Sequence, residues 1–172
     1  MRDATAVKYL YQGFTLIELL VTLAVAAVLL AIAVPGLRSI LLSNRLATTA
    51  NDVVNALDLT RSEAVKRNSR VDFKADGSVS ITAGAATTVI AGAVALPPNI
   101  SLGSVQSLQG TPTGFLQTAT GTGGFTGLVG DVGTSGLSSN NHRCIYLATG
   151  VATSTCVVSG ACPNAQPNPC SQ

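Results

Sequence analysis

Residues 14–35 read FTLIELLVTLAVAAVLLAIAVP, a run of apolar and small residues in which Glu18 is the only charged side chain. A helix of this length can span the hydrocarbon core of a bilayer. A carboxylate inside such a segment costs about 2.5–3.5 kcal/mol on insertion scales. The run therefore predicts a membrane-spanning helix, and Glu18 is expected to meet a partner that neutralises it.

The segment before this run, residues 1–13, is short and carries Arg2 and Lys8 against Asp3. Excess positive charge keeps the flanking end of a membrane helix in the cytoplasm. A conventional secretory signal places its small-residue cleavage site after the apolar segment, whereas Gly13 comes before it. This order predicts a leader that is removed, with the apolar helix of residues 14–36 kept on the mature chain.

Pro35 and Gly36 close the fully apolar segment, and a kink is expected there because proline removes a helical hydrogen bond. Beyond them the pattern becomes amphipathic. Apolar residues recur at helical spacing on one face, namely Leu46, Ala50, Val53, Leu57 and Ala64. This stripe predicts a second helical half, residues 37–68, that stops near Asn68 and packs on the rest of the chain.

After Asn68 the period changes from helical to alternating. Residues 70–74 and 78–82 alternate around the turn Ala75-Asp76-Gly77, which predicts a hairpin. Further strands are expected at 87–91, 100–108, 143–149 and 155–159, with one or two short strands in the Gly-rich stretch 110–139. The predicted fold class is α+β, in which the long N-terminal helix packs on an antiparallel sheet domain formed by residues 69–172.

The amino-acid composition restricts the functions that the chain can have. Only 10% of the residues are charged, against about 25% in a typical soluble domain. The net charge of +2 is too small to indicate a nucleic-acid-binding protein by itself. The chain has no Trp and three Tyr, which argues against a platform for stacking bases.

All four cysteines lie near the C-terminus, at Cys144, Cys156, Cys162 and Cys170. An even, clustered set behind an export signal indicates disulfides in an oxidising compartment, and free thiols are the alternative. Three connectivities are open. We favour Cys144 with Cys156, which a hairpin would bring together, and Cys162 with Cys170 across a proline-containing loop.

His142 and the cysteines are the only candidates for a metal site. Their spacing matches no paired zinc-finger pattern, and oxidised cysteines cannot act as ligands. Asp131 is the only acid in the C-terminal part of the chain, and no nucleophile motif accompanies it. We therefore expect no metal, no cofactor, no small-molecule substrate and no enzymatic activity.

The string Gly13-Phe14-Thr15-Leu16-Ile17-Glu18, with the apolar run behind it, resembles the class III signal and N-terminal helix of type IV pilins and type II secretion pseudopilins. The resemblance implies that a prepilin peptidase cleaves between Gly13 and Phe14 and methylates the new amino group of Phe14. It also implies that Glu18 pairs with the N-terminal amine of an adjacent subunit. The alternatives are an ordinary single-pass anchor, and a Glu18 that is protonated in the membrane without a partner.

Two later segments narrow the resemblance. Residues 59–68, followed by a strand, and residues 138–150 are similar to the helix end and the penultimate strand of the FimT/GspH group. The function implied is that of a minor type IV pilin, a structural subunit that helps to initiate or cap the pilus fibre. A GspH-like pseudopilin of type II secretion is the alternative.

The resemblance also implies the partners and the location. The partners are other pilin subunits, the prepilin peptidase and the inner membrane before assembly. The chain is expected to cross the bacterial inner membrane once, with a cytoplasmic N-terminus and a periplasmic C-terminal domain, and then to enter a pilus or pseudopilus.

DNA binding for natural transformation is a further alternative, because some FimT-type pilins bind DNA through basic residues near the C-terminus. This sequence departs from that pattern, since no Lys or Arg follows Arg143. DNA affinity depends chiefly on neutralising phosphates. The remaining candidate contacts are Arg61, Lys66, Arg67, Arg70 and Lys74. We interpret these as surface or subunit contacts, and nucleic acid as a less favoured partner.

Overall fold

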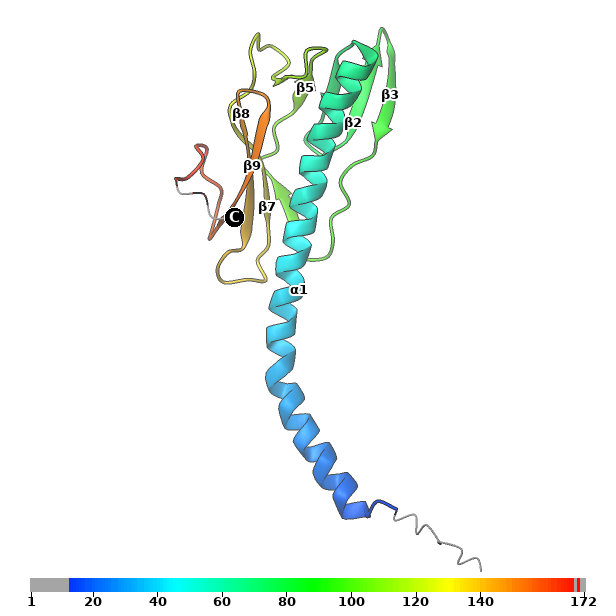
Figure 1. The fold of residues 1–172 in the computed structure, drawn as a ribbon, viewed down its shortest axis with the longest axis vertical. Helices are drawn as coiled ribbons and strands as arrows, with labels where there is room; N and C mark the ends of the chain where they lie inside the picture. The colour runs from blue at the N-terminus through cyan, green and yellow to red at the C-terminus, as the bar shows by residue number, and fades with distance from the viewer. Residues whose placement is uncertain (1–12, 169, 171–172) are drawn as a thin grey trace, which may run out of the picture. The chain divides into compact units, whose positions relative to one another are not determined.

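The computed structural model describes residues 13–168 and 170, and within them it contains one helix, α1 (Leu16–Arg67), as Figure 1 shows. Most of the predicted leader, residues 1–12, lies outside the described residues. The chain divides after Arg38 into two units, which are described separately below.

The first unit contains the apolar part of α1. Every helical residue up to Arg38 is exposed, and the helix contains a segment that is long and apolar enough to cross a membrane. Pro35 lies inside α1 and does not end it, although proline removes one backbone donor. The kink expected at Pro35 and Gly36 stays a prediction.

The C-terminal end of α1 is closed by a Schellman motif. Asn68 has a positive φ of 49°, and its N–H donates to the Val65 carbonyl at 3.2 Å. The N–H of Ser69 donates to the Ala64 carbonyl at 3.1 Å. Asparagine tolerates the left-handed conformation that this motif requires, which explains why the helix stops at the predicted place.

The second unit places the predicted apolar stripe of α1 in the core. All five stripe residues are at most 1% exposed. Thr49, Ala56 and Thr60 extend the same buried face, and the Thr60 hydroxyl donates to the Ala56 carbonyl at 2.7 Å. The amphipathic pattern therefore predicted correctly which face of the helix is buried.

Two antiparallel sheets form the rest of the second unit. The first has the strand order β3-β2-β1-β5-β6 and consists of β1 (Val71–Phe73), β2 (Val79–Ala83), β3 (Ala86–Ala91), β5 (Leu108–Gly110) and β6 (Leu116–Gln117). The second has the order β4-β7-β8-β9 and consists of β4 (Ser101–Gly103), β7 (Gly127–Gly133), β8 (His142–Ala148) and β9 (Ala152–Val158). The expected α+β class, a long helix packed on antiparallel sheets, is confirmed.

The hairpin predicted around Asp76 is confirmed as β1 and β2. The Asp76 carboxylate accepts a hydrogen bond from the Ser78 N–H at 2.9 Å, and Gly77 has a φ of 78°. The hydrogen bonds from Ser78 lower the pKa of Asp76 below its ordinary value. The local turn chemistry therefore fixes the position at which the chain reverses.

The prediction of a single strand over residues 100–108 was wrong. Ser104 has a φ of 50°, and it separates β4 in one sheet from β5 in the other. One or two short strands were predicted for the Gly-rich stretch 110–139. It contains β6 and β7, but β7 is longer than expected and lies inside the second sheet between β4 and β8.

We predict that Gly110→Ala destabilises the second unit by about 1–3 kcal/mol, because β5 lies directly against α1. A Cβ at Gly110 would lie 2.8 Å from the Thr60 carbonyl oxygen and 3.1 Å from the Ala64 Cβ. Urea unfolding of the full chain in detergent measures the effect. Gly92→Ala is the matched control, since nothing lies within 4 Å of a Cβ there. Equal midpoints for both variants would contradict this packing.

Candidate functional site

The residues Gly13, Phe14 and Thr15 precede the first turn of α1. The side chain of Phe14 is 82% exposed, so the peptide bond between Gly13 and Phe14 lies in a non-helical and accessible segment. Such a segment is a suitable substrate for a peptidase, because a protease needs extended and accessible backbone.

Thr15 and Glu18 together begin the helix. The Glu18 N–H donates to the Thr15 Oγ1 at 3.3 Å, and the Leu19 N–H donates to the Thr15 carbonyl at 3.2 Å. The spacing Thr-x-x-Glu is the signature of a capping box, in which Thr is the N-cap and Glu is the third helical residue. Sequence reasoning missed this role of Thr15, although the spacing itself signals it.

Glu18 is exposed and lies within an exposed apolar surface. Among the described residues, no cation lies within ion-pair distance of its carboxylate. Its large apolar neighbours Ile17, Leu19 and Leu20 are each more than half exposed. The carboxylate is therefore available to a cation from outside the described chain.

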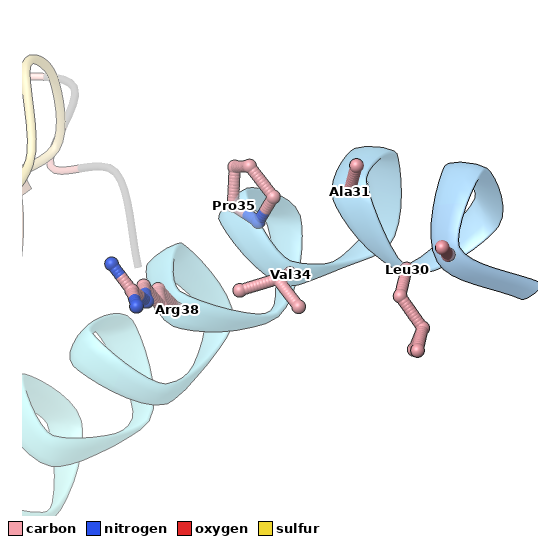
Figure 2. A pocket seen from close by; sticks show the side chains of 6 residues that line it. Leu30, Ala31, Val34, Pro35 and Arg38 are labelled. Carbon is pink, nitrogen blue, oxygen red and sulfur yellow. The ribbon is translucent and has the colours of Figure 1, made fainter.

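A shallow hollow lies along one face of the same apolar helix (Figure 2). It is lined by Ala27, Leu30, Ala31, Val34, Pro35 and Arg38. The small residues Ala27 and Ala31 lower the helix surface on this face. The many exposed large apolar side chains along this part of α1 indicate a membrane or a protein partner.

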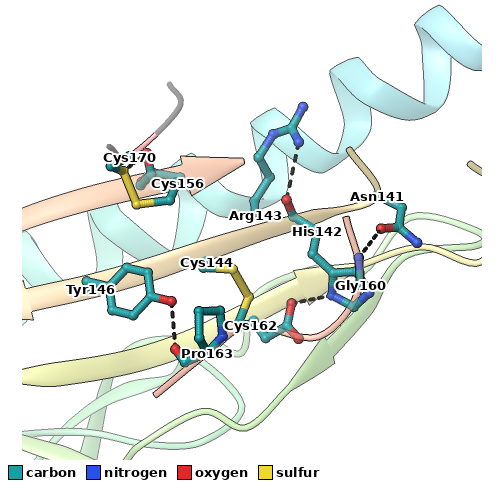
Figure 3. The surroundings of a disulfide bond; sticks show 12 residues. Asn141, His142, Arg143, Cys144, Tyr146, Cys156, Gly160, Cys162, Pro163 and Cys170 are labelled. Carbon is teal, nitrogen blue, oxygen red and sulfur yellow. Dashed lines mark hydrogen bonds and ion pairs between the residues drawn. A yellow bond between two sulfur atoms is a disulfide. The ribbon is translucent and has the colours of Figure 1, made fainter. Parts of the chain in front are cut away.

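The cysteines form two disulfides, and the favoured pairing was wrong. Cys144 bonds to Cys162, and Cys156 bonds to Cys170, with Cα separations of 5.5 and 5.3 Å (Figure 3). Cys144 and Cys156 are cross-strand neighbours in β8 and β9, as expected for a hairpin. Each of them bonds instead to a cysteine of the C-terminal tail, the segment after β9 that begins at Gly160. The two bridges therefore attach the tail to the sheet.

Polar contacts on both sides of Cys162 also attach this tail. The Tyr146 hydroxyl donates to the Pro163 carbonyl at 2.6 Å, and the Gly160 N–H donates to the Asn141 Oδ1 at 2.8 Å. Burial, and to a lesser degree the charge of Asp131, raise the pKa of Tyr146. The sequence carries no local signal for these contacts, since they join segments that are distant along the chain.

We predict that removing the first disulfide, with Cys144→Ser and Cys162→Ser together, lowers the free energy of unfolding by about 2–3 kcal/mol. The bridge closes a loop of 18 residues, which restricts the unfolded chain. Urea midpoints of the full chain before and after the change give the value. Peptide mapping under non-reducing conditions is the control, and a Cys144–Cys156 linkage would contradict the structure.

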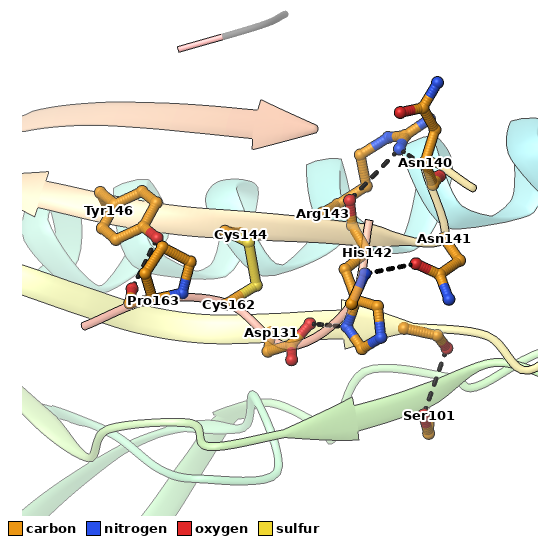
Figure 4. A network of polar contacts seen from close by, with 12 residues as sticks. Ser101, Asp131, Asn140, Asn141, His142, Arg143, Cys144, Tyr146, Cys162 and Pro163 are labelled. Carbon is orange, nitrogen blue, oxygen red and sulfur yellow. Dashed lines mark hydrogen bonds and ion pairs between the residues drawn. A yellow bond between two sulfur atoms is a disulfide. The ribbon is translucent and has the colours of Figure 1, made fainter. Parts of the chain in front are cut away.

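His142 lies beside the first disulfide and bonds to Asp131 (Figure 4). Its Nδ1 is 2.7 Å from the Asp131 Oδ1, and the Cβ that Gly133 lacks would collide with the imidazole ring. The Cys162 sulfur lies within 4.8 Å of the nearest ligand atoms of both residues, but it is held in the disulfide with Cys144. A disulfide sulfur is a poor metal ligand, because metal ligation requires the thiolate.

The Asp131–His142 pair is not hydrogen-bonded to the Ser101 hydroxyl on the neighbouring strand. The Ser101 hydroxyl, on the strand beside β7, donates to the Gly133 carbonyl at 3.2 Å instead of to His142. Nucleophilic catalysis needs the base within hydrogen-bond reach of the nucleophile. The arrangement of Asp131 and His142 thus fits a structural hydrogen bond between neighbouring strands.

The basic residues considered for DNA contact lie at the end of α1 and beside β1. Arg61 pairs with Asp58 at 2.9 Å and also donates to the Val151 carbonyl at 2.8 Å. These contacts give Nη1 and Nη2 of its guanidinium partners from the chain itself. Arg70 and Lys74 flank β1 and have no ion pair within the described part of the chain.

Glu63 binds the other two basic residues. The Arg67 Nε lies 2.6 Å from one carboxylate oxygen, and the Lys66 Nζ lies 3.4 Å from the other. The hydrogen bond from Arg67 is the main reason that the pKa of Glu63 is lowered, and Lys66 adds to it. These pairs reduce the positive potential at this end of α1, so the geometry does not add support for DNA binding.

Comparison with protein families gives two matches. Residues 10–34 match the prokaryotic N-terminal methylation motif, and residues 49–167 match type II transport protein GspH, which covers well over half of the 172 residues. The chain belongs to the GspH family. No curated protein and no solved structure matched the chain. The predicted resemblance to the FimT/GspH group is thereby confirmed.

Membership of the GspH family, with the methylation motif, gives the chain a type IV pilin-like or pseudopilin role. Proteins of these families are structural subunits that assemble with other pilin subunits. The methylation motif implies a prepilin peptidase as a processing partner. The apolar N-terminal helix and the motif also fit anchoring in the inner membrane.

Proposed function

We propose that this GspH-family chain is a minor type IV pilin, a low-copy structural subunit that helps to initiate or cap the pilus fibre. The observation that carries the proposal is the exposed apolar helix, with Glu18 as its only charge before Arg38, inside a methylation motif. A low-charge, Gly-rich domain suits a subunit whose task is packing against neighbours.

Processing precedes assembly in this account. The peptidase cleaves between Gly13 and Phe14, and the new amino group of Phe14 is methylated. Before cleavage, Arg2 and Lys8 keep the leader in the cytoplasm, so the C-terminal domain lies in the periplasm. That oxidising compartment suits the two disulfides.

Assembly depends on Glu18. A lone carboxylate in lipid is unfavourable, whereas a carboxylate that meets an ammonium group between packed helices is compensated. The N-terminal amine of a neighbouring subunit is the proposed counter-charge. This pairing sets how far one subunit lies along the fibre axis from the next.

A pseudopilin of type II secretion is the second candidate, and the description of the matched family as a type II transport protein favours it. Both candidates share the helix, the cleavage site and the Glu18 contact. They differ in whether the fibre belongs to a type IV pilus or to a type II secretion system.

Deletion of the coding sequence in its host separates the two candidates. For a minor pilin we expect fewer surface fibres and lost twitching motility, with secretion of exported enzymes unchanged and both defects restored by the intact chain. Lost secretion with normal twitching would instead assign the chain to the type II system and overturn the minor-pilin proposal.

A further inference from the structure

A groove runs between α1 and β9 in the second unit. Its volume is about 330 Å³, and it is lined by Ala47, Ala50, Asn51, Arg143, Thr153, Ser154, Thr155 and Val157. The helix side is formed mainly by small residues, which leaves room beside the strand. The strand side carries hydroxyl groups, so the groove is polar where it meets β9.

Arg143 contributes a positive charge to this groove. It extends from β8, and its Nη2 donates to the Ser43 Oγ on α1 at 3.3 Å. Its Nη1 donates to the Asn140 carbonyl at 3.0 Å and to the His142 carbonyl at 3.3 Å, and Figure 3 shows the second of these contacts. All of these acceptors are neutral. Across residues 13–168 and 170, no carboxylate lies within ion-pair distance of this guanidinium.

The charge of Arg143 is partly removed from water. Burial lowers the pKa of Arg143 below its ordinary value, and no nearby acid opposes that effect. A guanidinium stays protonated in proteins, so the group remains a cation in a partly desolvated site. A cation in that position is stabilised when an anion binds it.

Two further features of β9 bear on binding at this groove. The Thr153 Oγ1 is buried and has no hydrogen-bond partner among the described residues. β9 is the last strand of its sheet, so its outer backbone edge has no strand partner within the described chain. A buried hydroxyl without a partner costs stability, and a strand edge can pair with an added peptide.

We propose that this groove binds an acidic side chain of a neighbouring pilin subunit, with Arg143 as the cation that pairs with it. The inference rests on the proposed function, since it takes another pilin subunit as the partner. Arginine presents its donors in a planar fork that matches the two oxygens of a carboxylate. The contact therefore fixes the orientation of the carboxylate in addition to neutralising its charge. The unpaired edge of β9 receives the backbone on either side of the acid.

A protein carboxylate fits the groove better than nucleic acid does. Nucleic-acid affinity depends on neutralising several phosphates, and among the described residues Arg143 is the only cation that lines the groove. Arg61, the basic residue of α1 that reaches the turn before β9, is already paired with Asp58. One cation beside hydroxyl groups matches one carboxylate.

The test uses the full chain in detergent and a fluorescent peptide, Ac-Thr-Val-Glu-Val-Thr-amide, beside the same peptide with Gln in place of Glu. Fluorescence anisotropy should show that the Glu peptide binds at least about tenfold more tightly, because only it carries the charge. Arg143→Gln should abolish that preference, and Arg143→Lys should keep part of it. Equal binding of the two peptides to the unaltered chain would overturn the proposal.

Arg70→Gln is the matched control, since it removes one positive charge from an exposed position without an ion pair. It should leave the preference unchanged, and an equal loss in both variants would show a general charge effect and overturn the site. A double-stranded oligonucleotide that bound through Arg143, without competition from the Glu peptide, would overturn the proposal in favour of nucleic acid.

Two more variants keep the test decisive if Arg143→Gln unfolds the chain. Asn51→Glu places a carboxylate in the groove, where it can pair with Arg143. It should raise the melting temperature of the chain and weaken the binding of the Glu peptide. Thr153→Val removes the unpartnered hydroxyl and should weaken the peptide several-fold without lowering the melting temperature. Unchanged peptide binding in both variants would overturn the proposal. If these variants are still processed at the N-terminus and still recovered in fibres at normal levels, the proposed function as a pilin subunit is unaffected.

Discussion

Replacing Glu18 by alanine should lower the amount of the chain in sheared fibres about tenfold or more, because the cation of the neighbouring subunit would lose its counter-charge in an apolar setting. The amount in the inner membrane should stay the same, since alanine inserts more easily than a carboxylate. Quantitative immunoblots of the fibre and membrane fractions measure both quantities in one culture.

Glu18→Gln separates charge pairing from helix capping. Glutamine can replace glutamate at the third position of a capping box, so the start of α1 next to Thr15 should be preserved. It carries no charge, so incorporation into fibres should fall as it does for Glu18→Ala. Normal incorporation of the Gln variant would show that Glu18 acts through the helix start and not through a partner.

Replacing Leu57 by alanine should lower the free energy of unfolding of the second unit by about 3–5 kcal/mol, since the side chain is fully buried and the surrounding core cannot close the cavity. Leu57 is 0% exposed and belongs to the core that α1 shares with strands of both sheets. A typical domain has only about 5–15 kcal/mol of stability, so this single change removes a large part of it. Urea unfolding in detergent, followed by circular dichroism, measures the loss.

Leu41→Ala is the matched control for Leu57→Ala. It makes the same chemical change on the same helix, where the side chain is 48% exposed. Its effect on unfolding should stay within about 0.5 kcal/mol. Comparable losses at both positions would contradict the burial of the predicted stripe.

The features that local sequence determines were predictable. The apolar spacing from Leu46 to Ala64 identified the buried face of α1, because helical period alone decides which residues share a face. The turn at Asp76 and Gly77 identified the first hairpin, because its φ requirement and side-chain cap lie within a few residues. The helix end at Asn68 followed for the same reason.

The features that depend on distant segments were not predictable. Residues 100–108 have the pattern of one strand, yet Ser104 has a positive φ and the segments on either side of it belong to different sheets. The cysteine pairing failed similarly, because the tail passes across β8 and β9 and offers each strand a separate partner. Sequence spacing carries no information about which face a tail covers.

The functional residues also fall into two groups, those that local sequence identifies and those that depend on distant segments. The motif from Gly13 to Glu18 can be recognised from the sequence alone, because peptidase recognition and helix capping both use contiguous residues. The environment of Arg143 cannot be read in this way. Its contacts include Ser43 on α1 and Asn140 in the loop before β8, and only the folded chain shows that no acid among the described residues pairs with it. The Thr153 hydroxyl, which has no partner among the described residues, becomes buried only in the folded chain.

Mass spectrometry of the N-terminus of this chain, purified from fibres, tests the account most directly. We expect a mature chain that begins with an N-methylated Phe14, since the motif places the cleavage after Gly13. A chain in the fibre fraction that still begins with Met1 would contradict it.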